Sequence, residues 1–503
     1  MKMSRSVVII GGGVGGLFTG AILAREGLRV TVLEKNTTAG GGLQSYSRFG
    51  EIFDTGMHVV GGMYEGGSTR RILDWLGIGS RLHLRDVDKD VTDSIFVSKD
   101  GRTYRISGGR DNFVKALAAE FPAQEQNLRE YVAALYRIAD EVDMFYLRPA
   151  RERVYSDEFL LSANALIDKY ITDDRLRALV AYFNPFYGGV KDTTPAYIHA
   201  IVSVLYINGP TRFAGGSYLL AEELKSFIER NGGSVLTSDG VVSVGTEGRF
   251  ITGVTTGSGK FYTADYYVCA IHPCTFFTLL DNPSALPLSY RNRLDSIPNS
   301  LSAFTLNIKL KKDAFRYINH SAYYVSDYAD VWKIGSIGET WPLGFLYMTP
   351  PDIGQGEYAT KLAVTAPMSW EEVSAWSGTS TGRRGAEYER WKKEHTDRIL
   401  DCLEEIYPGF RGCVDAVDAS SPLTIRDFYG VKQGSMCGFS KDCNNIILSQ
   451  VPVFTKIPNL FLTGQNCNLH GLCGVSLTAV NTAEAIMGQN HILDQLNGKV
   501  QTI

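Results

Sequence analysis

The sequence predicts an α/β protein with two domains, and three observations carry this prediction. The first is an apolar run, Val7–Ile10, followed at once by a glycine-rich turn. An apolar run without alternation is typical of a parallel strand that is buried on both faces. The second is a further apolar strand that ends in Glu34, and the third is alternation of apolar and polar residues over 300–440. A Rossmann-type domain joined to an α+β domain built on a mixed sheet explains all three.

The glycine-rich turn has the spacing of a dinucleotide-binding motif. Gly11, Gly13 and Gly16 form G-x-G-x-x-G, in which the first allows a tight turn and the second lets the backbone approach a pyrophosphate. The third lets a helix pack closely on the strand. Glu34 can accept hydrogen bonds from both hydroxyls of an adenosine ribose, and its charge would repel the 2′-phosphate of NADP. The whole unit therefore predicts a dinucleotide site, whereas the glycines alone would also fit a turn between core elements.

Length and composition exclude several classes of protein. A chain of 503 residues exceeds one ordinary core, and 44% hydrophobic with 21% charged residues is typical of a globular protein. A net charge of −4 lacks the excess positive charge that is typical of proteins that bind nucleic acid. The eight cysteines include no C-x-x-C pair and no metal-ligand spacing, which fits reduced thiols and predicts no metal site. The longest strongly apolar run, 200–207, is too short to span a bilayer. We expect a cytoplasmic protein, and peripheral contact at the inner face of a membrane stays open.

A second glycine cluster, Gly40-Gly41-Gly42, lies shortly after Glu34, and the segment Asp54-Thr55-Gly56-Met57-His58 follows it. Together with the dinucleotide motif, these residues resemble FAD-dependent oxidoreductases of the amine oxidase and phytoene desaturase superfamily. Within it, the segment 54–58 is most similar to the carotenoid isomerase and all-trans-retinol saturase branch. The resemblance implies FAD as cofactor and a glutathione reductase-like variant of the Rossmann fold. Leu43 departs from the pattern, because many relatives carry arginine there to contact the flavin ring.

The resemblance further implies that three separated segments bind FAD. The amino-terminal unit is the first, and a helix with a small β-meander, whose backbone holds the adenine, is the second. The third is a short strand, a loop over 466–474 and a helix over 475–487, whose N-terminus would stabilise negative charge on the flavin. The cofactor-binding residues expected on this basis are Gly11, Gly13, Gly16, Glu34, Lys35, Gly41, Gly42, Val242, Gly464, Gln465, Gly474 and Val475.

This division predicts a discontinuous FAD-binding domain of residues 1–85, 212–300 and 455–503. The substrate-binding domain would comprise residues 86–211 and 301–454. Aromatic residues are dense near the end of its first segment and just beyond it, and they could line a long apolar substrate cavity or pack in the core. These aromatic and histidine residues are the segment 182–187 with Tyr197, His199, Tyr206 and Phe213.

His58 and His470 are the candidate catalytic residues, because they lie nearest the expected flavin segments. Histidine titrates close to neutrality, so either could donate or accept a proton beside an alkene carbon. The alternative is that each one hydrogen-bonds the backbone or the cofactor.

The function implied by the resemblance is FAD-dependent oxidoreduction at carbon–carbon double bonds. Its substrate would be an apolar polyene, carotenoid or retinoid-like lipid, and the reaction a desaturation, a saturation or an isomerisation. One alternative is a flavin amine oxidase, which the segment 54–58 disfavours. The other is a non-catalytic isoprenoid- or lipid-binding chaperone of the same fold, which would not need three intact FAD segments.

Overall fold

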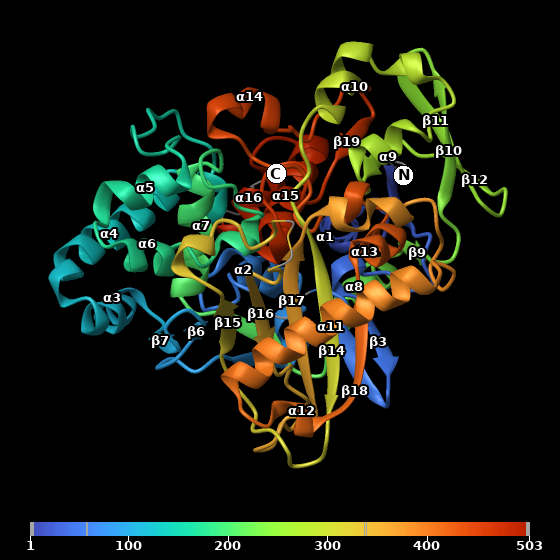
Figure 1. Ribbon diagram of the computed structural model, residues 1–503. Helices are drawn as coiled ribbons and strands as arrows, with labels where there is room; N and C mark the ends of the chain where they lie inside the picture. The colour runs from blue at the N-terminus through green and yellow to red at the C-terminus, as the bar shows by residue number, and fades with distance from the viewer. Residues whose placement is uncertain (1–4, 57–58, 337, 339, 499–503) are drawn as a thin grey trace.

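The computed structural model describes residues 5–56, 59–336, 338 and 340–498. Two large sheets organise these residues, and a group of helices lies beside them (Figure 1). The segments near the two ends of the chain come together in one of the sheets, because β1 (Ser6–Ile10) and β19 (Leu460–Leu462) pair with opposite edges of the same strand, β13 (Tyr266–Cys269).

The first sheet is the Rossmann-type sheet. Its strands run in the order β19-β13-β1-β2-β9, and every neighbouring pair is parallel. Alternate residues of the buried strand β1 serve two cores. Val7 and Ile9 pack with helix α1 (Val14–Arg25), and Val8 and Ile10 pack with residues of a β-meander on the other face. The strands are β1 (Ser6–Ile10), β2 (Arg29–Leu33), β9 (Ser234–Leu236), β13 (Tyr266–Cys269) and β19 (Leu460–Leu462).

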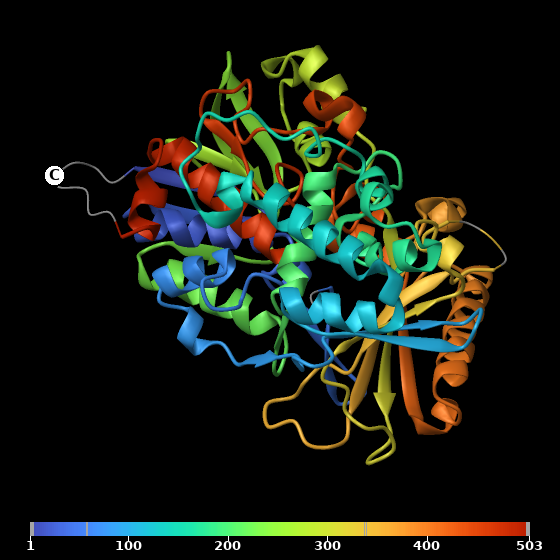
Figure 2. The ribbon, with the colours of Figure 1, turned by 90° about the vertical axis from the view of Figure 1, so that its left-hand side faces the viewer.

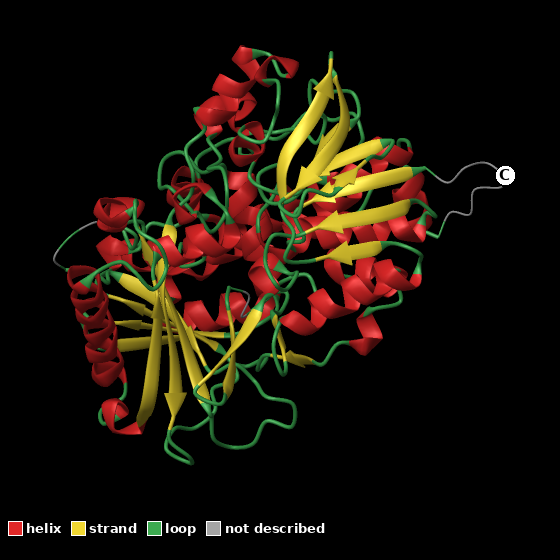
Figure 3. Ribbon diagram, turned by 90° about the vertical axis from the view of Figure 1, so that its right-hand side faces the viewer, coloured by secondary structure: helices red, strands yellow, loops and turns green. Residues whose placement is uncertain are grey.

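The helix α1 lies between two neighbours on its face of the sheet, because it packs against both α8 and α15. The meander is antiparallel, in the order β10-β11-β12. Figure 3 shows this meander as the upper group of strands beside the parallel sheet. These elements are α1 (Val14–Arg25), α8 (Tyr218–Arg230), α15 (Gly471–Met487), β10 (Val241–Glu247), β11 (Phe250–Thr256) and β12 (Phe261–Tyr262).

The second sheet is mixed and has the order β18-β14-β17-β16-β15-β6-β7. Its pairs are antiparallel, except that β6 and β15 run parallel. The long helix α11 (Ala386–Ile406) covers its outer face and shares a hydrophobic core with it (Figure 2, orange). The strands are β6 (Asp93–Val97), β7 (Arg102–Ile106), β14 (Ser302–Leu310), β15 (Ser321–Val325), β16 (Gly344–Met348), β17 (Lys361–Met368) and β18 (Val414–Ser420).

A group of helices packs on the inner side of the mixed sheet. Its central member, α7 (Ala196–Ile207), is buried along almost its whole length, which explains why its sequence is apolar on all sides. Around it lie α3 (Arg110–Glu120), α4 (Glu125–Asp140), α5 (Ala163–Tyr170) and α6 (Asp174–Val180). The remaining elements are α2 (Ser68–Trp75), α9 (Pro273–Phe277), α10 (Leu288–Asp295), α12 (Phe410–Cys413), α13 (Pro422–Tyr429), α14 (Ile446–Ser449), α16 (His491–Leu496), β3 (Ser45–Arg48), β4 (Glu51–Asp54), β5 (Leu84–Asp86) and β8 (Thr211–Phe213).

The predicted fold class is confirmed, with a Rossmann-type sheet and a mixed sheet backed by helices. The domain boundaries stay a prediction. The predicted start of the closing helix, at residue 475, was wrong: α15 begins at Gly471, four residues earlier. Gly471 and Gly474 have low intrinsic helix propensity, but burial of this first turn against the core overrides that propensity.

Candidate active site

A cavity of about 480 Å³ opens between the Rossmann-type sheet and the mixed sheet. Its wall includes the glycine turn after β1, the Gly41-Gly42 segment, the start of the meander and the segment before α15. All three segments that were expected to bind FAD therefore meet at this one cavity. The same wall continues over residues of β14, β15, β16 and β17, so the cavity extends from the nucleotide segments to the second sheet.

The glycines of the first turn are required by close approaches of the backbone. Gly11 has a φ of +105°, and a side chain there would lie 2.7 Å from Ile271. A Cβ atom on Gly16 would lie 2.1 Å from the carbonyl oxygen of Gly11, so helix α1 packs directly on the turn. Gly13 lines the cavity, and a Cβ atom there would have 4.0 Å of clearance. Gly16 thus shapes the turn, while Gly11 and Gly13 face the cavity.

The Glu34 carboxylate is held in place at the nucleotide end of the cavity. Its Oε2 atom accepts a hydrogen bond from the Gly12 N–H at 2.8 Å, and its Oε1 atom accepts one from the Asn36 N–H at 2.8 Å. Each oxygen keeps a lone pair, so the carboxylate can still accept from two hydroxyl groups. Lys35 also lines the cavity, and its Nζ atom donates to the carbonyl of Asp427 at 3.0 Å.

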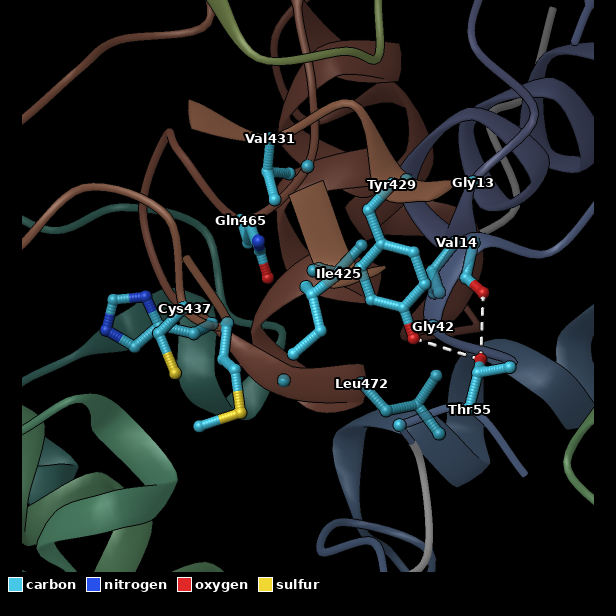
Figure 4. Close-up of a pocket in the computed structure, with 18 of the residues that line it drawn as sticks. Gly13, Val14, Gly42, Thr55, Ile425, Tyr429, Val431, Cys437, Gln465 and Leu472 are labelled. Carbon is cyan, nitrogen blue, oxygen red and sulfur yellow. Dashed lines mark hydrogen bonds between the residues drawn. The ribbon is translucent and has the colours of Figure 1, made fainter. Parts of the chain in front are cut away.

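Gly41 and Gly42 line the cavity. A hydroxyl pair that the sequence did not indicate, Tyr429 and Thr55, lies beside Gly42 (Figure 4). The Tyr429 hydroxyl, at the end of α13, donates to Thr55 Oγ1 at 2.9 Å, and that hydroxyl donates to the Gln44 carbonyl at 2.9 Å. Burial raises the pKa of Tyr429 to about 12, so this phenol is neutral. The sequence carries no comparable signal for this pair, because the glycine after Tyr429 marks only the end of the helix.

Leu43 differs from its glycine neighbours, because it is fully buried in the core and does not line the cavity. A contact from this position to a flavin ring is therefore replaced by packing against the core.

Val242 was expected to bind the cofactor, but its side chain does not line the cavity. Its side chain is 57% exposed, and the cavity wall is made instead by Gly240 and Val241. However, the pairing of β10 with β11 shifts between Val241 and Ser243, which makes Val242 the extra residue of a β-bulge. A bulged residue is left out of the ladder, so its backbone groups can serve another partner. Its role with the adenine stays a prediction.

Gly464, Gln465 and Val475 line the cavity, but Gly474 does not. A Cβ atom on Gly474 would lie 2.4 Å from the carbonyl carbon of Leu469, so this glycine permits close packing inside the first turn of α15. The N-terminus of α15 still reaches the cavity, because Gly471, Leu472 and Cys473 are part of the wall. The positive end of a helix dipole is thus directed at this point.

His470 also faces the cavity, and neither ring nitrogen has a hydrogen-bond partner among the described residues. Burial, followed by the charge of Lys441, lowers its pKa to about 3, so its imidazole is neutral. Lys441 is itself buried and donates to the carbonyls of Ser449 and Cys467. Burial lowers the pKa of Lys441 to about 8. His58 lies outside the described residues.

The dense aromatic residues divide between the cavity and the core. Tyr182, Phe186 and Tyr206 line the cavity, together with Tyr323 and Phe345 from the mixed sheet. The others pack in the core, and His199 is held there by the hydroxyls of two tyrosines. The residues that pack in the core are Phe183, Tyr187, Tyr197, His199 and Phe213.

The residues present fit FAD. A fixed, buried carboxylate, glycines that leave room for a pyrophosphate and the N-terminus of α15 share one cavity. In the described part of the chain, no cluster of three or more His, Cys, Asp or Glu side chains could hold a metal ion. None of the described helices combines the length and apolar character needed to cross a membrane.

This fold and site define an FAD-dependent oxidoreductase. The comparisons agree with that assignment, because the family described as flavin containing amine oxidoreductase matches residues 14–487. The chain belongs to this family. The hypothesis of a non-catalytic chaperone is therefore dropped.

Relatives and solved structures resemble the chain over nearly its whole length. The all-trans-retinol 13,14-reductase of Rattus norvegicus is 27% identical and covers 96% of this chain and 86% of that protein. The chloroplastic prolycopene isomerase 2 of an Oncidium hybrid cultivar is 23% identical and covers 95% and 83%. The structure of cyclohexylamine oxidase from Brevibacterium oxydans matches with a TM-score of 0.62 at 15% identity and covers 98% and 100%. At that identity, the structural likeness shows the fold alone.

Proposed function

We propose that this oxidoreductase acts on carbon–carbon double bonds of an apolar polyene, carotenoid or retinoid-like lipid. The observation that carries the proposal is the continuity of the cavity, which joins the FAD segments to an apolar, aromatic wall. The relatives support the same substrate class, because they include an all-trans-retinol 13,14-reductase and a prolycopene isomerase. The reaction is a desaturation, a saturation or an isomerisation.

The residues of the chain position the substrate and exclude water, because FAD supplies hydride chemistry when it is bound. Aromatic side chains such as Phe186 and Tyr206, whose rings stack 4.5 Å apart, form a rigid apolar wall. The N-terminus of α15 supplies backbone N–H groups and a positive potential at the other side. His470 is neutral in this environment and so acts in the proposal as a hydrogen-bonding group rather than as a cationic acid.

Amine oxidation fits the cavity less well. Among the described residues that line it, the one carboxylate is Glu34, which lies at the nucleotide end. A cationic amine would therefore find no negative partner at the aromatic end, where burial of an unpaired charge is costly.

The test uses holoprotein under anaerobic conditions, with the flavin either oxidised or reduced. Carotenoids and retinoids are mixed with each form, and a panel of amines is mixed with the oxidised form, while flavin absorbance is recorded. We expect a polyene to reoxidise the reduced flavin, to be isomerised by it or to reduce the oxidised flavin, and the amines to leave the oxidised flavin unchanged. Rapid reduction by an amine, with no response to any polyene, would overturn the proposal.

We also propose peripheral contact with a membrane surface, from which such a lipid would enter. Val154, Tyr155 and Ile447 are exposed apolar side chains, and Val190 adds a fourth. The segment after Val190 is joined to the segment just before α14, which carries Ile447, because the Cys443 N–H donates to the Thr193 carbonyl at 2.7 Å. Sedimentation with anionic vesicles should fall for Val154→Glu combined with Ile447→Glu. Equal sedimentation of this variant and the unaltered protein would contradict membrane contact through these side chains.

A further inference from the structure

The segment 427–432 forms part of the cavity wall and also faces solvent. Four of its residues line the cavity: Phe428, Tyr429, Gly430 and Val431. The side chain of Phe428 is at the same time 48% exposed. The segment begins in the last turn of α13, which Gly430 ends in a left-handed conformation with a φ of +66°. A single layer of chain therefore separates the cavity from solvent at this point.

This segment crosses the carboxyl end of strand β1. On one side, Asn36, which follows β2, donates from Nδ2 to the Phe428 carbonyl at 3.0 Å. On the other side, Thr275, in the helix that follows β13, donates from Oγ1 to the Gly430 carbonyl at 3.3 Å. The strand β1 lies between β2 and β13 in the parallel sheet, and the glycine turn of the dinucleotide motif follows it. The segment therefore spans the cavity at this turn, from one neighbouring strand end to the other.

The contacts that hold the segment to the Rossmann-type side are polar. Besides the two hydrogen bonds above, Lys35 Nζ donates to the Asp427 carbonyl at 3.0 Å, and Lys432 Nζ pairs with Asp295 Oδ1 at 2.7 Å. The side chains of Lys432 and Asp295 are 39% and 67% exposed. Among the described residues, none of 427–432 belongs to a hydrophobic core. Exposed polar contacts contribute little net free energy, because water competes for both partners.

The attachment to the mixed sheet is of a different kind. The Asp427 carboxylate accepts a hydrogen bond at 2.6 Å from Arg384, whose side chain is buried. Just beyond the other end of the segment, the Gly434 carbonyl accepts one at 2.7 Å from the buried Ser302 hydroxyl of β14. Breaking a buried charged pair is costly, because it leaves a charge without a partner. The segment can therefore detach from the Rossmann-type side while it stays fixed to the mixed sheet.

We propose that residues 427–432 form a clasp over the bound dinucleotide, and that FAD enters and leaves only while this clasp is detached from the Rossmann-type side. A dinucleotide with its ribose at Glu34 and its pyrophosphate at the glycine turn would lie between the clasp and the end of the sheet. Detachment opens the cavity along this length and leaves both sheets intact. The inference concerns the cofactor alone and does not depend on the identity of the substrate.

The test weakens the clasp at an ion pair that does not line the cavity. Holoprotein loaded with radiolabelled FAD is mixed with a large excess of unlabelled FAD, and the label that stays on the protein is measured over time. Lys432→Glu places two carboxylates together at Asp295, so we expect FAD exchange to become about fivefold faster. Combining Lys432→Glu with Asp295→Lys restores opposite charges, so the rate should return to within about twofold of that of the unaltered protein.

Lys393→Glu is the matched control. Lys393 forms an exposed ion pair with Asp397, also at 2.7 Å, but this pair lies on α11 at the outer face of the mixed sheet. The control should keep the exchange rate of the unaltered protein. An acceleration in Lys393→Glu as large as that in Lys432→Glu would overturn the clasp, because net charge rather than the segment would then control the rate.

Hydrogen exchange measures the opening itself. In protein saturated with FAD, the backbone amides of 427–432 should exchange faster in Lys432→Glu than in the unaltered protein, and the charge-swapped protein should reverse this change. An unaltered rate of FAD exchange in Lys432→Glu would overturn the clasp. Faster FAD exchange that persists in the charge-swapped protein, or that occurs without faster amide exchange in this segment, would overturn it as well.

Discussion

Gly15 and Gly464 meet through their backbones, because a Cβ atom on Gly15 would lie 2.8 Å from the Cα atom of Gly464. One glycine belongs to helix α1 and the other follows the strand β19, so the contact joins the first and last FAD segments. Two neighbouring hydroxyls support it, since Thr19 Oγ1 and Thr463 Oγ1 lie 2.9 Å apart. Geometry at the nucleotide end of the cavity therefore depends on the absence of a side chain at Gly15.

Gly15→Ala should lower both stability and flavin retention. The added methyl group meets backbone, which must shift, and overpacking of this kind costs about 1–3 kcal/mol. The measurements are the ratio of flavin to protein absorbance after gel filtration and the melting temperature. Gly378→Ala is the control, because a Cβ atom there meets nothing within 4 Å. Full flavin content in Gly15→Ala would show that the contact is not needed.

Glu34→Arg should weaken FAD retention strongly, because it places a cation where the ribose hydroxyls need an acceptor and where two backbone N–H groups already converge. Equilibrium dialysis of the apoprotein against FAD measures the loss, which we expect to exceed about tenfold in Kd. The same charge change at the exposed residue Glu247 should have no effect. Unaltered affinity in Glu34→Arg would exclude the ribose contact.

Two substitutions at Val242 separate the backbone of this residue from its side chain. Val242→Ala should leave FAD affinity unchanged, because the side chain is exposed and does not line the cavity. Val242→Pro removes the N–H group and should weaken FAD binding if the bulged backbone holds the adenine. Dialysis against FAD distinguishes the two. Equal affinity of both variants would argue against an adenine contact by this N–H group.

We expect the protein to lose stability in mild acid, because it buries neutral histidines. Burial lowers the pKa of His199 to about 3, below the value of an exposed histidine, so the unfolded chain binds more protons between these two values. The contribution of this group to the free energy of unfolding is complete above pH 6.5 and is lost as the pH falls toward 3. About 2 kcal/mol of it is lost by pH 5. The melting temperature of His199→Gln should therefore fall less between pH 7 and pH 5 than that of the unaltered protein. His83→Gln is the control, because His83 is exposed, and it should show the full fall. An equal fall in all three proteins would contradict this explanation.

Most of the fold and the nucleotide half of the site could be predicted from the sequence, because their determinants are local. The turn after β1 requires glycine at fixed spacing, and Glu34 ends the next strand of the same unit. The hydroxyl pair of Tyr429 and Thr55 could not be found in this way, because its members come from α13 and the segment after β4 and share no periodicity. The aromatic residues were undecided for a related reason: Phe186 faces the cavity and its neighbour Tyr187 faces the core, and composition alone does not distinguish them.

The contact between Gly15 and Gly464 also constrains the order of events during biosynthesis. A ribosome translates about 450 codons between these two glycines, and domains form as units while the chain is being made. A nascent polypeptide that has not yet emerged as far as α15 lacks one wall of the nucleotide site. Flavin loading is therefore a late step of maturation, and prematurely terminated products would be colourless.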